Sequence, residues 1–242
     1  MFTKKDTIYS SALEKVERFV FNKEVAEVFD DMIHRSVPGY DAIIAMVGAL
    51  AATYAESGSK IFDLGCSLGA ATEAMSSNVS PDIEIMAVDN SQAMLDKCRL
   101  RMQKTSPHNP IQFVCSNIQD VPIKNASFVV LNFTLQFIAP LERKAMLQKI
   151  YEGMNPGGVL IISEKIAFDD PKEQALQSRL HEEFKRLNGY SELEIAQKRA
   201  ALEDVLIPET LKTHSDRLYE IGFKHVSNWF QSFNFASLLA FK

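Results

Sequence analysis

The residues best suited to chemistry follow a short apolar run, in the segment Asp63-Leu64-Gly65-Cys66-Ser67-Leu68-Gly69. Glycine adopts positive φ angles and lets a ligand come close to the backbone. A turn of this kind, opening a helix whose first N–H groups are unpaired, suits a nucleotide or a carboxylate. The phosphate-binding motif G-x-x-x-x-G-K-[ST] and the dinucleotide motif G-x-G-x-x-G are both absent from the sequence. The turn alone is therefore also compatible with a tight connection that binds nothing.

A second candidate is Asp89, which ends the next apolar run, 26 residues after Asp63. A carboxylate at the end of a strand can accept hydrogen bonds from both hydroxyls of a ribose, and each charge-assisted bond contributes roughly 1.5–3 kcal/mol. A lone Asp in this place could instead stabilise the dipole of the following helix. Its spacing from the glycine turn favours a nucleoside site.

Five short apolar runs are expected to form the strands that present these side chains. They alternate with helical patterns, which is typical of a parallel sheet with helices on both faces. The expected strands are residues 60–64, 84–89, 111–115, 128–133 and 159–163. The last of them is entered through Asn155-Pro156-Gly157-Gly158, a strong turn signal.

Further elements flank these strands. Two amphipathic helices precede them and are separated by Pro38-Gly39-Tyr40, which favours a turn. Residues 165–217 interrupt the alternation with more helices, one of which opens with a capping-box pattern at 191–194. Two closing strands at 225–230 and 236–241 are expected to form a hairpin.

Composition excludes several classes of protein. The chain has 242 residues, of which 46% are apolar and 24% charged, as in ordinary globular proteins. We expect one domain over residues 1–242, with an N-terminal helical segment at 1–57 and the 165–217 insert acting as a lid. Three Cys do not suggest a secreted disulfide scaffold, and neither a signal peptide nor a membrane-spanning run is recognisable. We therefore expect a cytoplasmic protein.

The charge pattern gives little support to nucleic-acid binding. A net charge of −5 provides no broad attraction to nucleic acid or to anionic lipid. The densest basic cluster is Lys97, Arg99, Arg101 and Lys104, which we interpret as the solvated face of a helix. No direct binding to nucleic acid or membrane is expected. No metal is expected either, because the cysteines lack the spacing of metal ligands.

The glycine turn, Asp89, the pair Asn117-Ile118 and the turn Asn155-Pro156-Gly157-Gly158 together resemble the class I S-adenosylmethionine (SAM)-dependent methyltransferases. The resemblance implies an α/β, Rossmann-like class I methyltransferase fold, with a seven-stranded, mostly parallel sheet and an antiparallel last strand. It implies that the methionine end of SAM meets Gly65, Cys66 and Ser67. It also implies that Asp89 and Asn90 bind the ribose and that Asn117 and Ile118 bind the adenine. Asn117 departs from the commoner Asp, although its amide oxygen could still accept from the adenine amino group.

A more specific resemblance covers nearly the full length of the chain and points to the carboxy-S-adenosyl-L-methionine synthase family. It is carried by the phrases 24–29, 35–40, 63–67, 131–137 and 188–194. It implies additional contacts from Tyr40, Asn132 and Arg199, a homodimer, and SAM as a substrate with carboxy-SAM as the product. The implied reaction converts SAM and prephenate to carboxy-SAM, phenylpyruvate and water. The product would pass to a tRNA carboxymethyltransferase that modifies the wobble uridine.

Arg199 is the candidate catalytic residue. On the helix expected to follow Ser191, it falls on one stripe with Ile195, Leu202 and Leu206. A guanidinium among apolar neighbours needs a carboxylate partner, from the protein or from a ligand. Our hypothesis is that Arg199 holds the new carboxylate of the product, or a carboxylate of prephenate before it. An ordinary catalytic base is not evident, since the five His residues are scattered; they are His34, His108, His181, His214 and His225.

Three alternatives remain open from the sequence. A small-molecule SAM-dependent methyltransferase would share every nucleoside-binding residue and differ only in its acceptor. A SAM-binding fold kept as a non-enzymatic partner module would also need no base. Direct tRNA binding would have to use the basic cluster described above.

Overall fold

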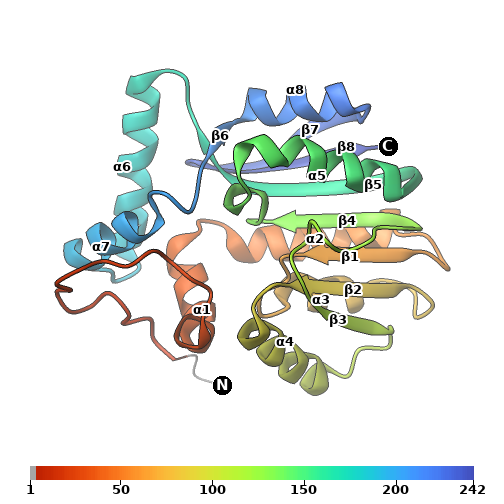
Figure 1. Cartoon of the computed structure of the whole chain (residues 1–242), viewed down its shortest axis with the longest axis horizontal. Coiled ribbons are helices and arrows are strands. Elements are labelled where there is room, and N and C mark those ends of the chain that lie inside the picture. Colours follow the sequence, from red (N-terminus) through yellow and green to blue (C-terminus); the bar gives the residue numbers. More distant parts are fainter. Residues whose placement is uncertain (1–3) are drawn as a thin grey trace.

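The computed structural model describes residues 4–242 and shows a twisted sheet with helices on both faces (Figure 1). The strands are β1 (Lys60–Leu64), β2 (Glu84–Asp89), β3 (Ile111–Cys115), β4 (Ala126–Asn132), β5 (Met154–Ala167), β6 (Glu209–Thr210), β7 (Lys224–Ser232) and β8 (Phe235–Phe241). The helices are α1 (Lys23–Ser36), α2 (Tyr40–Tyr54), α3 (Ala70–Ser76), α4 (Gln92–Thr105), α5 (Pro140–Gly153), α6 (Pro171–Leu187), α7 (Glu192–Leu202) and α8 (Leu211–Ile221), with a 3₁₀ turn η1 (Leu135–Phe137).

The sheet has the expected topology. Its order is β3-β2-β1-β4-β5-β8-β7, and the short β6 pairs with β5 off this path. Strands β1 to β5 are parallel to one another, whereas β8 runs antiparallel to both β5 and β7. The class I methyltransferase fold, with its parallel core and antiparallel last strand, is confirmed, and so is the closing hairpin.

The central strand β4 shows why the sheet is covered on both faces. Successive side chains of a strand point to opposite faces. Val129 and Leu131 pack with α5 and α8 on one face, and Phe128 and Val130 pack with α2 and α3 on the other. All four side chains are fully buried, which explains why the sequence of β4 is continuously apolar and does not alternate between apolar and polar residues.

Strand β5 is longer than its sequence pattern indicates. The expected strand covers residues 159–163, but β5 begins at Met154 and continues to Ala167. Its last residues extend past β4 because β8 pairs with it as far as Lys165 and β6 pairs with it at Ile166 and Ala167. Polar residues at the end of β5 are therefore held in regular structure beside the ends of the neighbouring strands.

Helices α6 and α7 of the insert lie at one end of the sheet, on the left of Figure 1, and α6 packs against α1. The capping box at the start of α7 is confirmed: the Glu194 N–H donates to Ser191 Oγ at 3.3 Å, and the Ser191 N–H donates to Glu194 Oε2 at 2.7 Å. Helix α8, which contains residue 217, packs instead with α5 on the sheet. Of the insert's helices, only α6 and α7 therefore lie over the carboxyl ends of the strands.

The segment 4–22 forms turns and bends without a helix or strand, so the helices of the N-terminal part are α1 and α2. It attaches to α7 across the chain: the Phe19 N–H donates to the Ala201 carbonyl at 2.9 Å. The Tyr190 hydroxyl, just before α7, donates to the buried carboxylate of Asp6 at 2.5 Å. The two distant parts of the chain thus form one wall.

Within residues 4–242, no single helix is both long and apolar enough to cross a membrane. Only α1 and α2 taken together reach the required length and composition, and they are bent by 98° at their junction.

Candidate functional site

A cavity of about 690 Å³ lies at the carboxyl ends of β1, β2 and β4, between these ends and α1, α6 and α7. This is the edge at which open α/β sheets bind ligands. Nine of the ten residues expected from the sequence line it. They are Tyr40, Gly65, Cys66, Ser67, Asp89, Asn90, Asn117, Ile118 and Asn132.

The glycine turn is tied to β2. The N–H groups of Gly65 and Cys66 both donate to the Val88 carbonyl, at 2.8 and 2.9 Å, and the Ser67 N–H donates to Asp89 Oδ2 at 2.9 Å. Gly65 has a φ of +86°, and a Cβ at this position would overlap the side chain of Thr134. The turn therefore does not offer these three N–H groups to a ligand. Glycine serves here to bring the backbone of the turn against the loop after β4.

Asp89 holds two elements together while facing the cavity. Its Oδ1 accepts from the Ser91 N–H at 2.8 Å, and its Oδ2 accepts from the Ser67 N–H. Burial raises the pKa of Asp89, and these two N–H donors oppose the rise. Each carboxylate oxygen keeps a lone pair for a further donor. The geometry thus leaves Asp89 able to accept from ribose hydroxyls.

The residues expected to contact the adenine, Asn117 and Ile118, line the cavity together with Asp89. The side-chain amide of Asn90 donates to Asn117 Oδ1 at 3.1 Å, and Asn117 Nδ2 lies 3.4 Å from Asp120 Oδ2. Ile118 is buried and gives this end of the cavity an apolar surface. These hydrogen bonds orient the Asn90 and Asn117 side chains, and the Asn117 oxygen keeps one lone pair for a further donor.

Asn132 and Tyr40 line the part of the cavity next to the glycine turn. The Oδ1 of Asn132 is buried, and no described residue donates a hydrogen bond to it. A buried acceptor without a donor is unfavourable, so this atom fits a donor carried by a ligand. Burial raises the pKa of Tyr40, whose ring packs 6.4 Å from that of Phe133. Its hydroxyl therefore stays neutral and can donate.

Asp63 supports the glycine turn from below. It is buried, and its carboxylate accepts from the Thr72 hydroxyl of α3 at 2.6 Å. Burial raises the pKa of Asp63 to about 6, and the hydrogen bond from Thr72 limits that rise. The pair fixes α3 relative to β1.

Arg199 does not line the cavity of its own chain. Its side chain is 65% exposed and forms an ion pair with Glu182 of α6. The expected stripe through Ile195, Arg199 and Leu206 is wrong, because α7 ends at Leu202 and its buried face passes through Ile195 and Lys198. The carboxylate that pairs with Arg199 within the chain belongs to the protein.

Four titratable residues of the cavity were not anticipated from the sequence: Lys165 at the end of β5, His181 and Lys185 on α6, and Lys198 on α7. His181 is one of the five scattered His residues among which the sequence shows no evident catalytic base. It is buried, its Nε2 lies 2.8 Å from the Ser36 carbonyl, and burial lowers its pKa well below the usual range. The spacing of His181 and Lys185, four residues apart, does place them on one helix face.

A buried carboxylate shapes the loop after β4. Glu164 of β5 accepts from the N–H groups of Leu135 and Gln136, at 2.8 and 3.1 Å, at the start of η1. Burial raises the pKa of Glu164 to about 8, and these donors oppose the rise. The Gln136 side chain in turn accepts from the Lys165 N–H at 2.9 Å. The sequence pattern did not mark Glu164 or Gln136 as site residues, because the contact between them joins segments 28 residues apart.

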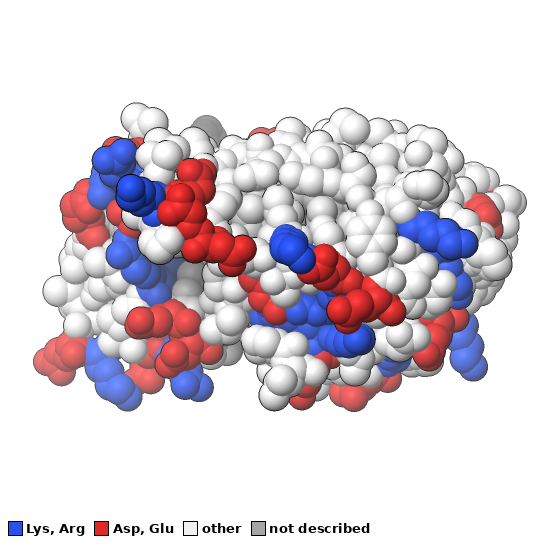
Figure 2. Space-filling view, turned by 90° about the horizontal axis from the view of Figure 1, so that it is seen from above, with Lys and Arg blue, Asp and Glu red and all other residues white. Residues whose placement is uncertain are grey.

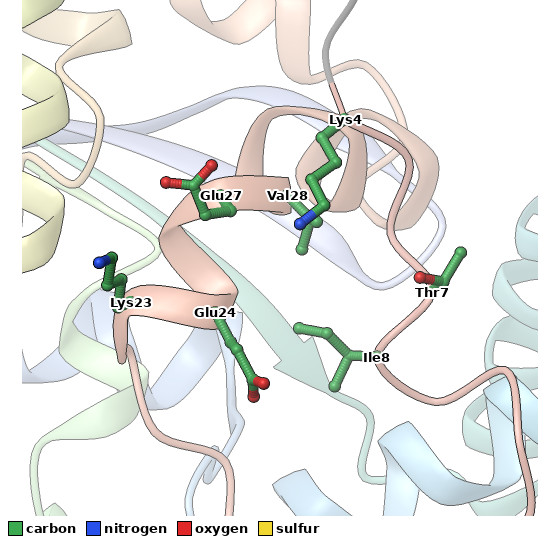
Figure 3. Close-up of a pocket in the computed structure, with 7 residues that line it drawn as sticks. All are labelled: Lys4, Thr7, Ile8, Lys23, Glu24, Glu27 and Val28. Carbon is green, nitrogen blue, oxygen red and sulfur yellow. The ribbon is translucent and has the colours of Figure 1, made fainter.

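A second hollow of about 480 Å³ lies between residues 4–8 and the start of α1 (Figure 3). Its charged lining consists of Lys4, Lys23, Glu24 and Glu27. Glu27 is paired with Lys97 of α4 at 2.7 Å. No residue expected from the sequence analysis lies in this hollow.

Basic side chains are mostly matched by acidic ones at the surface. On α4, Arg99 pairs with Asp96 at 3.2 Å and Arg101 pairs with Glu73 at 2.6 Å. On the face seen in Figure 2, Lys and Arg are interspersed with Asp and Glu rather than gathered in one patch. Arg101 is only 30% exposed, so the basic cluster is less solvated than its sequence pattern indicates.

Two of the solved structures with the same fold are methyltransferases solved with SAM. Human N-acetylserotonin methyltransferase, solved with SAM, aligns with a TM-score of 0.61 at 16% identity and covers 90% of this chain and 56% of its own. Magnesium protoporphyrin IX methyltransferase from Synechocystis, solved with bound SAM, aligns with a TM-score of 0.57 at 14% identity and covers 93% and 86%. At this level of identity the likeness establishes the fold.

Sequence comparison is more specific. Residues 61–158 match the model of a methyltransferase domain family. The chain is 55% identical to carboxy-S-adenosyl-L-methionine synthase of Trichlorobacter lovleyi, with complete coverage of both chains. It is 49% identical to the enzyme of that name from Escherichia coli, over 98% of this chain and 97% of the other. With this identity over its full length, the chain belongs to the carboxy-S-adenosyl-L-methionine synthase family.

Proposed function

We propose that this protein converts SAM and prephenate to carboxy-SAM, phenylpyruvate and water. The observation that carries the proposal is the full-length identity of 49–55% to carboxy-SAM synthases, because the aligned region spans nearly the whole chain rather than the nucleoside-binding motifs alone. The orphaned Oδ1 of Asn132 supports a ligand that brings its own donor, such as the ammonium of the methionine end of SAM.

The proposed contacts follow the cavity from one end to the other. Asp89 and Asn90 bind the ribose, and Asn117 and Ile118 enclose the adenine. The methionine end lies against the turn 65–67, with Tyr40 and Asn132 on either side of it. None of these contacts requires a metal.

The proposed reaction balances without an external oxidant or base. The sulfonium of SAM acidifies its methyl C–H, so that loss of one proton allows carbon to attack CO₂. Prephenate supplies that CO₂ by losing its ring carboxylate, and it expels its hydroxyl as hydroxide when the ring becomes aromatic. The hydroxide takes the methyl proton and leaves as water. The protein must hold both substrates together and exclude bulk water, so that CO₂ and the carbanion meet before either is lost.

The direct test is to incubate the purified protein with SAM and prephenate and to weigh the nucleoside product. We expect a species heavier than SAM by one CO₂, together with phenylpyruvate in equal amount. Omission of prephenate should leave SAM unchanged. Formation of S-adenosylhomocysteine with a methylated acceptor would instead identify a small-molecule methyltransferase.

We further propose that Arg199 acts on the cavity of a second copy of the chain, in a homodimer. Its exposure, and its absence from the lining of its own cavity, support a role across subunits. The Arg199→Ala variant should bind SAM normally and lose carboxy-SAM formation.

Mixed dimers test this arrangement. Subunits carrying Arg199→Ala should be combined with subunits carrying Asp89→Ala, each inactive alone. If Arg199 acts across subunits, one cavity of every mixed dimer contains both native residues, and activity returns to a sizeable fraction of the wild-type value. If Arg199 serves its own cavity, neither cavity is complete and the mixture stays inactive.

The remaining proposals concern the cellular setting. We propose that the protein works in the cytoplasm and that its product passes to a tRNA carboxymethyltransferase. The interspersed surface charges support a protein that does not itself bind RNA.

A further inference from the structure

One end of the cavity is lined by three lysines that come from different elements. Lys165 ends β5, Lys185 lies on α6 and Lys198 lies on α7. The opposite end carries the carboxylates of Asp63 and Asp89. The cavity is therefore polarised, with acidic groups near the proposed ribose site and ammonium groups beneath the insert.

Two of these ammonium groups have no partner among the described residues. Neither a carboxylate within ion-pair distance nor a hydrogen-bond acceptor contacts the Nζ of Lys165 or Lys185. Lys198 alone is compensated, by Ser36 Oγ at 3.0 Å and by Asp6 Oδ2 at 3.7 Å. The charge of the cluster therefore exceeds what the protein neutralises.

Burial and mutual repulsion make this arrangement unfavourable in the free protein. Burial, together with the charges of Lys198 and Lys165, lowers the pKa of Lys185 to about 7. Burial likewise lowers the pKa of Lys198 to about 8, although Asp6 opposes it. The pKa of Lys165 is lowered by burial and by the nearby Arg199. Groups held in such a state inside a cleft are characteristic of a ligand site rather than of a structural ion pair.

Apolar rings lie beside the lysines. Phe133 and Phe235 line the cavity and pack edge to face at 5.9 Å, and the His181 ring packs against Phe235 at 4.9 Å. A ligand for this end should therefore combine anionic groups with a flat apolar body.

We infer that Lys165, Lys185 and Lys198 bind the carboxylates of the second substrate, a cyclic dicarboxylate, and hold it between the insert and the SAM methyl group. This inference rests on the proposed function, in which prephenate is that dicarboxylate. The lysines neutralise its two charges and orient it, so they are binding residues and take no proton in the reaction as written. The carboxylate of the methionine end of SAM has the same chemistry, and the experiment must separate the two sources.

The test compares Lys185→Met with Lys172→Met, which removes an exposed lysine from the same helix. Calorimetry in the presence of S-adenosylhomocysteine gives the Kd of prephenate without requiring turnover. We expect Lys185→Met to raise that Kd, and the KM for prephenate, about 10-fold or more, because a charge-assisted contact to carboxylate is lost. The Kd of SAM should change less than twofold, and Lys172→Met should behave as wild type.

A pH series adds a readout that a merely structural role would not move. The groups facing Lys185 are Lys165, His181 and Lys198, and Lys198 is in turn held by Asp6. Since Lys185 loses its proton as the pH rises through about 7, the prephenate Kd of the wild type should increase between pH 6 and pH 9. Lys185→Arg keeps its charge over this range and should flatten that increase.

Unchanged prephenate binding in both Lys185→Met and Lys165→Met would overturn the inference. A rise in the Kd of SAM without a change for prephenate would assign the lysines to the methionine carboxylate instead. A wild-type protein that binds prephenate but forms no carboxy-SAM would refute the proposed function and leave the lysine site standing. The thermal midpoint of Lys185→Met should not fall, since the variant removes a partly buried charge without a partner.

Discussion

Replacement of Asp89 by alanine should weaken SAM binding about 100-fold or more. The proposed ribose site depends on its two oxygens, and charge-assisted bonds of about 1.5–3 kcal/mol each correspond to at least a tenfold change in Kd apiece. The same substitution also leaves the N–H groups of Ser67 and Ser91 without the hydrogen bonds that they donate to Asp89. Binding is measured by calorimetry with SAM alone, so that prephenate does not enter the result.

Two further variants separate binding from stability. Asp89→Asn keeps one acceptor oxygen and nearly the same volume, and should lose less affinity than Asp89→Ala. Asp96→Ala removes a 62% exposed carboxylate from α4 and should leave the Kd unchanged. If Asp89→Ala bound SAM with wild-type affinity while folded, Asp89 would not be a ribose ligand.

Gly65→Ala should lower the free energy of unfolding by about 2–5 kcal/mol. A residue with a Cβ in the left-handed region loses about 1–2 kcal/mol, and φ is +86° here. The new methyl group would also overlap Thr134, and overpacking of this kind costs about 1–3 kcal/mol. Urea unfolding without SAM measures the loss, which is a large fraction of the total stability of an ordinary domain.

The chain offers a matched control for backbone strain alone. Gly58 has a φ of +72° and nothing within 4 Å of its ideal Cβ, so Gly58→Ala should lose only about 1–2 kcal/mol. Adding Thr134→Ala to Gly65→Ala removes the overlapping side-chain atoms and should recover the difference between the two sites. Equal losses for the two single variants would show that the Thr134 loop moves away easily and does not confine the turn.

Local sequence signals were sufficient for the first four strands of the parallel sheet and for a polar group at the end of one of them. Alternation of apolar runs with helical patterns depends on neighbouring residues, and β1 to β4 form within two residues of where that pattern places them. Asp89 ends an expected strand, and the carboxyl ends of parallel strands meet at one edge of the sheet. The position of Asp89 was therefore predictable before any contact was known, whereas Asn132 was expected only from the family resemblance.

The insert half was not predictable in the same way. The apolar stripe on which Arg199 was placed included Leu206, which lies past the end of α7. Without Leu206, the buried face of the helix contains Lys198 instead of Arg199. Residues three and four apart both lie near one helix face, so a single misplaced apolar residue decides which cation is buried. Lys165, Lys185 and Lys198 resemble solvated lysines in sequence, and only long-range packing encloses them.

The wall formed by segment 4–22 and α7 has a consequence for how the protein is made. The carboxylate of Asp6 accepts its hydrogen bond from Tyr190, which is synthesised 184 residues later. The N–H of Phe19 likewise donates to the carbonyl of Ala201, near the end of α7. A nascent chain leaving the ribosome can form its first parallel strands early, but it cannot close this wall until α7 has emerged. Contacts between such distant positions form late, because closing the long intervening loop must come first. Apolar residues such as Val28 and Met32 therefore stay partly uncovered during most of synthesis, and exposed apolar surface of this kind makes an incomplete chain prone to aggregation.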